Sequence, residues 1–148
     1  MSKKKVDLLY EELSYAIRGA AIEVKKNYGL GHKEILYQRA FAEELNLRRI
    51  KFEREKPIKI YSPKTRKVIG SYQPDFIIEN KIIVVLKVLE RMPKMMIDQL
   101  YSYLRNSEFG LGLLINFGSD GVDIKRVIYT NDRKKYLNTQ IISRIRNQ

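Results

Sequence analysis

The sequence predicts an α/β domain in which helices pack against a mixed β-sheet, and three patterns support this prediction. Apolar residues near the N-terminus recur at steps of three and four, which is the period of an amphipathic helix. From Ile50 the apolar period changes to two, which is typical of strands. Residues 82–86 are apolar on both faces, as expected of a central strand that is covered on both sides. We expect the elements in the order α, α, β, β, β, α, β, β, α.

The N-terminal part of the chain predicts two helices. The first carries its apolar stripe over residues 9–24 and ends at Gly29 and Gly31, because glycine adopts the left-handed backbone of a helix C-terminus without a steric penalty. The second begins near His32 and ends around Asn46. Four of its residues are expected to face inward at helical spacing: Tyr37, Ala40, Phe41 and Leu45.

Three strands are expected before the third helix. Residues 50–61 alternate between apolar and polar, and residues 67–78 predict a long strand that returns beside them after a turn at Ser62-Pro63-Lys64. The central strand, residues 82–86, follows a turn at Glu79-Asn80. The remaining elements are a helix that Pro93 opens and that ends around residues 106–110, a buried strand over 111–117, an edge strand over 122–129, and a short helix in the basic residues after 130.

Length and composition limit the classes of protein to consider. A chain of 148 residues with 44% hydrophobic content buries one core, so we expect one domain over residues 1–130 and a basic tail over 131–148. The longest uncharged apolar stretch is far too short for a membrane span, and the start of the chain lacks the apolar core of a signal peptide. We therefore expect a cytoplasmic protein without a membrane partner.

The chain contains no cysteine and a single histidine, His32. These counts exclude disulfides, thiolate metal sites and histidine metal clusters. Any metal site must therefore use oxygen ligands. His32 itself is more typical of a capping or surface residue than of a general base.

The charge of the chain favours a polyanionic partner. Lysine and arginine number 29 against 17 acidic residues, which leaves a formal charge of +12. Nucleic acid is the first expectation, since a basic protein gains affinity for it by releasing counterions. The alternative is that the charge serves solubility alone.

Three clusters of residues together carry a family resemblance. They are Gly-His-Lys-Glu-Ile-Leu-Tyr at 31–37, Asp75 followed by Val-Leu-Lys at 85–87, and Gln-Leu-Tyr-Ser-Tyr-Leu at 99–104 with Gly-Leu-Leu-Ile-Asn-Phe at 112–117. Across residues 29–117 the chain resembles the GxxExxY family of the PD-(D/E)XK nuclease superfamily. The resemblance implies a restriction-endonuclease-like fold and an ancestral metal-dependent nuclease activity. It also places Val85 where that family carries its catalytic glutamate.

A phosphodiesterase site can be outlined from the residues themselves. Hydrolysis of a phosphodiester needs a hard divalent cation, Mg²⁺ or Mn²⁺, and carboxylates at positions 75 and 85 would hold such an ion. Lys87, two residues further on the same strand face, would neutralise transition-state charge. Asp75 shares this face only if the two strands pair residues whose numbers sum to about 160, around a turn at residues 79–81. Otherwise Asp75 is a solvated strand residue.

Val85 cannot coordinate a metal, so a replacement ligand is worth seeking. Glu79 and Glu90 are poor candidates because of their distance along the strand and their parity. The resemblance implies that Glu34, a helix acid, faces the metal site beside Asp75, although it is equally a first-turn acid favoured by the helix dipole. The resemblance also assigns Gln99 a contact with the site or with nucleic acid; a surface glutamine is the alternative.

Four further residues are candidates for contacts with nucleic acid. Lys81, Arg91 and Lys94 could bind backbone phosphates, or they could form an ordinary solvated rim. Tyr37 could touch a phosphate, but an aromatic residue at helical spacing with Phe41 is more often part of the core.

Three functions remain open at this point. The first is a metal-dependent nuclease that acts through Asp75, Lys87 and Glu34. The second is a nuclease-derived module that has lost turnover through Val85 and binds nucleic acid, with DNA favoured over RNA. The third is a protein-interaction domain. A homodimer is compatible with the family but no sequence feature marks an interface.

Overall fold

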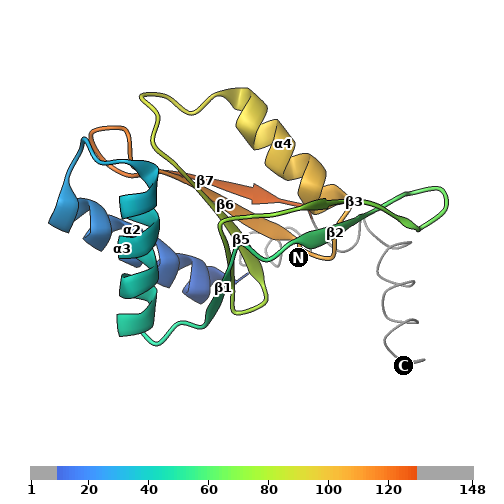
Figure 1. Cartoon of the computed structure of the whole chain (residues 1–148), viewed down its shortest axis with the longest axis horizontal. Coiled ribbons are helices and arrows are strands. Elements are labelled where there is room, and N and C mark those ends of the chain that lie inside the picture. Colours follow the sequence, from blue (N-terminus) through green and yellow to red (C-terminus); the bar gives the residue numbers. More distant parts are fainter. Residues whose placement is uncertain (1–9, 130–148) are drawn as a thin grey trace.

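The structure of the protein, a computed structural model, describes residues 10–129 (Figure 1). The predicted helical tail over residues 131–148 lies outside this described part. Three helices are present in it: α2 (Glu11–Tyr28), α3 (Glu34–Leu47) and α4 (Lys94–Arg105). Each lies where the apolar period predicts a helix. Among them, none is long and apolar enough to cross a membrane.

A mixed five-stranded sheet forms the centre of the fold. Its strands are β1 (Phe52–Arg54), β4 (Phe76–Ile78), β5 (Ile82–Lys87), β6 (Leu111–Asn116) and β7 (Asp123–Ile128), in the spatial order β1-β4-β5-β6-β7. The β5 and β6 strands are parallel, and the other pairs are antiparallel. This confirms the predicted α/β class, the central place of residues 82–86 and the edge position of the last strand.

The helices cover both faces of the sheet (Figure 1). Side chains alternate along β4 and β5, so Phe76, Val84 and Leu86 join the core cluster that contains α2 and α3. Ile77 and Val85 point the other way and join the cluster that contains α4. Both faces are therefore dry, which explains why the sequence of β5 is apolar throughout.

Two of the predicted long strands are each divided in the structure. The segment predicted as one strand over 50–61 forms β1 and β2 (Ile58–Tyr61), and the segment over 67–78 forms β3 (Val68–Tyr72) and β4. The β2 and β3 strands pair only with each other and make a separate two-stranded sheet. The antiparallel return is thus correct, but the continuity of the strands is wrong.

The physical reason for these breaks lies in the residues at each interruption. Glu55 has a positive φ of 53° and precedes Pro57, and Pro74 interrupts the second segment. Proline cannot donate to a strand ladder, and a left-handed residue turns the chain out of the sheet. The period of two continues on both sides of each break, which is why the pattern alone did not reveal them.

The register of the β4–β5 hairpin agrees with the sequence prediction. Phe76 pairs with Val84 and Ile78 pairs with Ile82, so the paired numbers sum to 160. Glu79 and Asn80 take positive φ values of 53° and 57° in the turn. This register places position 75 opposite position 85.

Candidate active site

Asp75 lies immediately before β4, where its carboxylate reaches across to β5. Its Oδ2 accepts a hydrogen bond from the backbone N–H of Leu86 at 2.7 Å. Burial raises the pKa of the Asp75 carboxyl above its ordinary value, while the Leu86 N–H and the charge of Lys87 act in the opposite direction. The carboxylate is therefore fixed beside position 85 and is only partly exposed to solvent.

Lys87 is the last residue of β5, two positions after Val85 and therefore on the same face of the strand. It is half-buried. Its positive charge lowers the pKa of both Asp75 and Glu34, which shows that it lies close to both carboxylates. Partial burial of a lysine is costly, and its place beside two acids is typical of a lysine in a functional site.

Glu34 is the first residue of α3, and the helix brings it to the same place. A negative side chain is favoured in the first turn of a helix, so the sequence has a local reason to begin α3 here. Burial raises the pKa of the Glu34 carboxyl, the charge of Asp75 raises it further, and Lys87 lowers it. The predicted neighbours Glu34, Asp75 and Lys87 are thus brought together from the start of α3, the residue before β4 and the end of β5.

Gln38 joins these residues and was missed by the sequence analysis. Its Nε2 lies 3.2 Å from Glu34 Oε2 and 3.3 Å from Asp75 Oδ1, and its Oε1 accepts a hydrogen bond from Arg54 at 3.1 Å. Gln38 is only 7% exposed. One amide therefore bridges both carboxylates and is itself held by a guanidinium. Spacing of four residues from Glu34 on one helix face was the signal that could have found it.

Val85 sits in a dry part of this site. It is 8% exposed and belongs to the apolar cluster that contains Ile83 and Leu114. Its side chain supplies packing where the register would place a second strand carboxylate opposite Asp75.

Glu55 is a third acid near Asp75. Its backbone N–H donates to the Asp75 carbonyl at 3.2 Å, and its charge raises the pKa of the Asp75 carboxyl. It is exposed, whereas Glu34 and Asp75 are not. Glu55 was not a candidate from the sequence, because only the break after β1 brings it there.

The segment that follows Lys87 is held rigidly by Asn116. This asparagine is fully buried, and its side chain accepts hydrogen bonds from Leu89 N–H and Gly118 N–H and donates to the Leu89 carbonyl. A Cβ at Gly118 would lie 2.3 Å from the Leu89 carbonyl oxygen, so glycine is required for this approach. These contacts consequently fix the chain two residues after Lys87.

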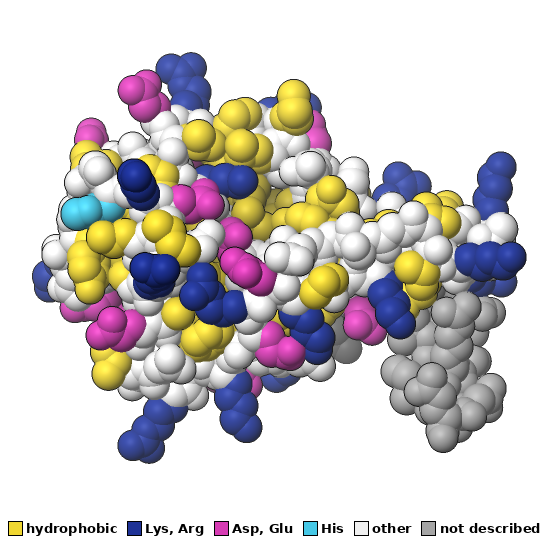
Figure 2. Space-filling model, in the orientation of Figure 1, with side chains coloured by type: hydrophobic (Ala, Val, Ile, Leu, Met, Phe, Trp, Pro, Cys, Tyr) yellow, Lys and Arg dark blue, Asp and Glu magenta, His cyan; other side chains and the backbone are white. Residues whose placement is uncertain are grey.

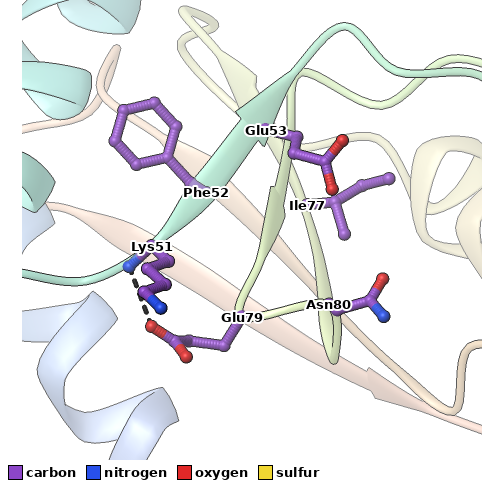
Figure 3. A pocket seen from close by; sticks show the side chains of 6 residues that line it. All are labelled: Lys51, Phe52, Glu53, Ile77, Glu79 and Asn80. Carbon is purple, nitrogen blue, oxygen red and sulfur yellow. Dashed lines mark hydrogen bonds between the residues drawn. The ribbon is translucent and has the colours of Figure 1, made fainter.

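Glu79, Asn80 and Lys81 lie at the opposite end of β5 from Lys87. That separation is roughly 20 Å at the rise of a strand. Glu79 Oε1 accepts a hydrogen bond from Lys51 N–H beside a hollow of about 360 Å³ (Figure 3). Glu79 and Lys81 are thus remote from Asp75, and Lys81 lies instead over the ring of Tyr10 at 5.8 Å.

Tyr37 is placed in the core rather than on the surface. It is fully buried, it stacks on Phe117 with ring centroids 4.8 Å apart, and its hydroxyl donates to the Gly29 carbonyl. This placement favours the core interpretation over a phosphate contact. The ring of His32 lies 2.9 Å from the Tyr28 carbonyl at the end of α2, as expected of a capping residue.

Gln99, Arg91 and Lys94 are exposed around α4. Arg91 and Lys94 follow Lys87 along the chain. Within the described residues, no hydrogen bond joins Gln99 to Asp75, Glu34 or Gln38.

The donor set fits a hard divalent cation that is bound by few protein ligands. Asp75 and Glu34 offer two neighbouring carboxylates. Burial raises the pKa of both, the charge of Asp75 raises that of Glu34 further, and a cation between them would relieve this cost. Mg²⁺ commonly uses one or two carboxylates and completes its shell with water and phosphate oxygens. Over residues 10–129 no group of three or more acidic or histidine side chains is arranged to hold a metal.

Comparison with known proteins identifies one family. The model of the PD-(D/E)XK nuclease superfamily matches residues 11–127. Within the described part of the chain, these residues span every helix and strand except the last residue of β7. Among curated proteins, none is significantly similar to the chain in sequence.

Proposed function

Because most of its length matches that family model, the chain belongs to the PD-(D/E)XK nuclease superfamily, and we propose that it hydrolyses phosphodiester bonds of nucleic acid with a divalent metal ion. The observation that carries this proposal is the convergence of Asp75, Glu34 and Lys87. They come from three separate segments of the chain, and Gln38 bridges the two carboxylates. The charge of Lys87 lowers the pKa of both carboxyls, and the charge of Asp75 raises that of Glu34. A purely structural role would not require two half-buried acids to share one place.

Each residue has a distinct role in the proposed site. Asp75 and Glu34 would hold Mg²⁺ or Mn²⁺, which when bound polarises the phosphate and acidifies a water molecule. Lys87 places its positive charge where negative charge grows on the phosphate during the reaction. Gln38 keeps the two carboxylates at a fixed separation, and Arg54 keeps Gln38 in that orientation.

We further propose that the chain belongs to the GxxExxY group and that Val85 replaces a metal-binding glutamate of that group. The register supports this assignment, because it brings position 85 opposite Asp75 on the face that carries Lys87. Loss of one carboxylate weakens the cation site without removing it, so the expected result is a slow enzyme that requires a high metal concentration.

A nucleic-acid-binding protein without turnover is the second candidate. Val85 is 8% exposed and packs within an apolar cluster, so its surroundings suit an apolar side chain better than a metal-binding carboxylate. The charge of +12 supports binding in either case.

The test is a cleavage assay with single- and double-stranded DNA and RNA in Mg²⁺ and in Mn²⁺. The wild type should cleave at least one polymer, and Asp75→Ala should not. Binding without cleavage by both proteins would support the second candidate. If neither protein binds or cleaves any of the four polymers, both candidates are wrong.

A further inference from the structure

The β2–β3 hairpin projects away from the five-stranded sheet (Figure 1). Its two strands pair with each other and with no other strand of the described chain. Most of its residues are exposed, including Val68 at 49% and Ile69 at 68%. A two-stranded ribbon by itself adds little to the stability of a domain. We therefore consider the hairpin as a binding surface for a partner molecule.

The charge of the hairpin indicates the chemistry of that partner. From Pro57 to Pro74 the sequence contains no acidic residue and four basic ones: Lys59, Lys64, Arg66 and Lys67. The three lysines are exposed, and Figure 2 shows Lys and Arg side chains around the far end of the hairpin. Lys56, just before this segment, is instead paired with Glu53 at 3.0 Å. Exposed lysines in a segment that contains no acidic residue fit a polyanion.

Hydrogen bonds hold the tip of the hairpin in one conformation. Ser62 Oγ accepts from the backbone N–H groups of Lys64 and Thr65, and its own N–H donates to the Lys67 carbonyl at 2.8 Å. Arg66 N–H donates back to the Ser62 carbonyl at 2.8 Å. The lysines at the tip are therefore presented on an ordered turn, which reduces the entropy lost on binding.

The base of the hairpin is anchored beside the candidate active site. Tyr72 stacks on Tyr103 of α4 with ring centroids 3.8 Å apart, and it precedes Asp75 by three residues. Ile58 is 6% exposed and belongs to the same apolar cluster as Val85. The ribbon thus extends from the site, and its tip lies roughly 15–20 Å away at the rise of a strand.

We infer that the β2–β3 hairpin is an arm that binds the phosphate backbone of double-stranded DNA while the candidate active site engages the same molecule. This inference rests on the proposed function. A two-stranded ribbon fits the major groove of B-DNA, whereas the deep, narrow major groove of duplex RNA does not admit it. Single strands are bound through stacking on open aromatic rings. The aromatic residues of the arm do not offer such a surface, because Tyr72 is stacked on Tyr103 and Tyr61 is half-buried.

A salt titration of binding tests the arm. The arm variant is Lys59→Gln/Lys64→Gln/Lys67→Gln, and the matched control removes three exposed cations elsewhere, Arg18→Gln/Lys26→Gln/Lys51→Gln. Binding to a 30-base-pair DNA duplex is measured by fluorescence anisotropy in metal-free buffer, so that no cleavage occurs. The slope of log Kobs against log salt should fall in magnitude by about 2.7 in the arm variant, at roughly 0.9 per lost phosphate contact. The control variant should keep a slope close to that of the wild type.

A second variant adds a positive charge to the arm, and misfolding would not produce the tighter binding that we expect from it. Ile69→Lys adds a cation to an exposed position of the arm and should tighten duplex binding about tenfold at low salt. The proposed role of the arm is wrong if the arm and control variants give equal salt slopes. It is also wrong if the arm variant loses as much affinity for single-stranded DNA as for duplex DNA. If the wild type binds and cleaves but the arm and control variants behave alike, only this inference is wrong. If the wild type binds no nucleic acid, the proposed function is wrong as well.

Discussion

The carboxylate of Asp75 is docked on the backbone N–H of Leu86 at 2.7 Å, across the junction of β4 and β5. This contact joins the residue before one strand to the residue after Val85 on the next. It fixes the Asp75 side chain next to Lys87 irrespective of what position 85 carries. The position of Asp75 therefore does not depend on the side chain at position 85.

Replacing Gln38 tests whether the bridge between the two carboxylates supports the site. Gln38→Leu keeps the size of the side chain but removes its bonds to Glu34, Asp75 and Arg54. Removing a hydrogen bond that orients a metal-binding side chain typically costs about 10–100-fold in metal affinity or activity. Calorimetric titration with Mn²⁺ should show a loss in that range. The control is Arg39→Gln on the exposed neighbouring position, and equal affinities for the two variants would exclude the bridging role.

Replacing Asn116 tests the support of the segment after Lys87. Asn116→Ala leaves the N–H and carbonyl of Leu89 and the N–H of Gly118 without their partner in a buried place. The expected loss is about 2–4 kcal/mol of the free energy of unfolding, measured by chemical denaturation. Ser119→Ala, in the same loop, removes one exposed hydrogen bond and should change stability by less than about 0.5 kcal/mol. A difference between the two below 1 kcal/mol would contradict this role.

The raised pKa values of Asp75 and Glu34 predict how stability depends on pH. An acid whose pKa is higher in the folded state than in the unfolded state holds its proton more tightly when folded, so stability is lost as pH rises through its titration. The metal-free protein should therefore lose this contribution above about pH 4, the ordinary value of a free aspartate. In Asp75→Asn the loss should be smaller.

Thermal denaturation at several pH values measures this difference. The Tm of Asp75→Asn relative to wild type should increase between pH 4 and pH 7 in metal-free buffer. Ser119→Ala removes no titratable group, so it serves as the control and should keep a constant difference in Tm from wild type. If the Tm of Asp75→Asn relative to wild type stays constant or decreases with pH, folding does not raise the pKa of the Asp75 carboxyl.

Restoring a carboxylate at position 85 should couple stability to metal. Val85→Glu places a charge in a site that is 8% exposed and opposite Asp75, so the metal-free variant should lose about 1–3 kcal/mol. Adding Mn²⁺ should raise the Tm of Val85→Glu by more than it raises that of wild type. Val85→Gln has the same shape without the charge. If Mn²⁺ raises the Tm of both variants equally, position 85 is not beside the cation site.

Much of the fold could be predicted because local signals and burial agree. Gly29 and Gly31 end the first helix with φ values of 69° and 94°, as the sequence suggested. The β4–β5 register agrees with the condition that Asp75 share a strand face with positions 85 and 87, around a turn at residues 79–81. The breaks at Pro57 and Pro74 were not predicted, because the alternation resumes beyond each of them with the same period.

The site was predicted in part. Asp75, Glu34 and Lys87 could be brought together once the register and the family resemblance were combined. Gln38 and Arg54 were not predicted as part of the site. Their contact depends on how closely α3 approaches the end of β1, and no local sequence pattern indicates that distance. Tyr37 was ambiguous for a related reason: its spacing with Phe41 fits both a buried and a surface face until packing decides.

The single-turnover cleavage rate of Val85→Glu relative to Val85→Gln, measured on duplex DNA in Mn²⁺, tests most directly that Asp75, Glu34 and Lys87 form a nuclease site that lacks one ligand. The two variants differ by one charged oxygen at position 85. We predict that Val85→Glu cleaves at least about 100-fold faster than Val85→Gln and faster than wild type, and that adding Asp75→Ala abolishes the gain. Equal rates for Val85→Glu and Val85→Gln, or a gain that survives Asp75→Ala, would contradict the account.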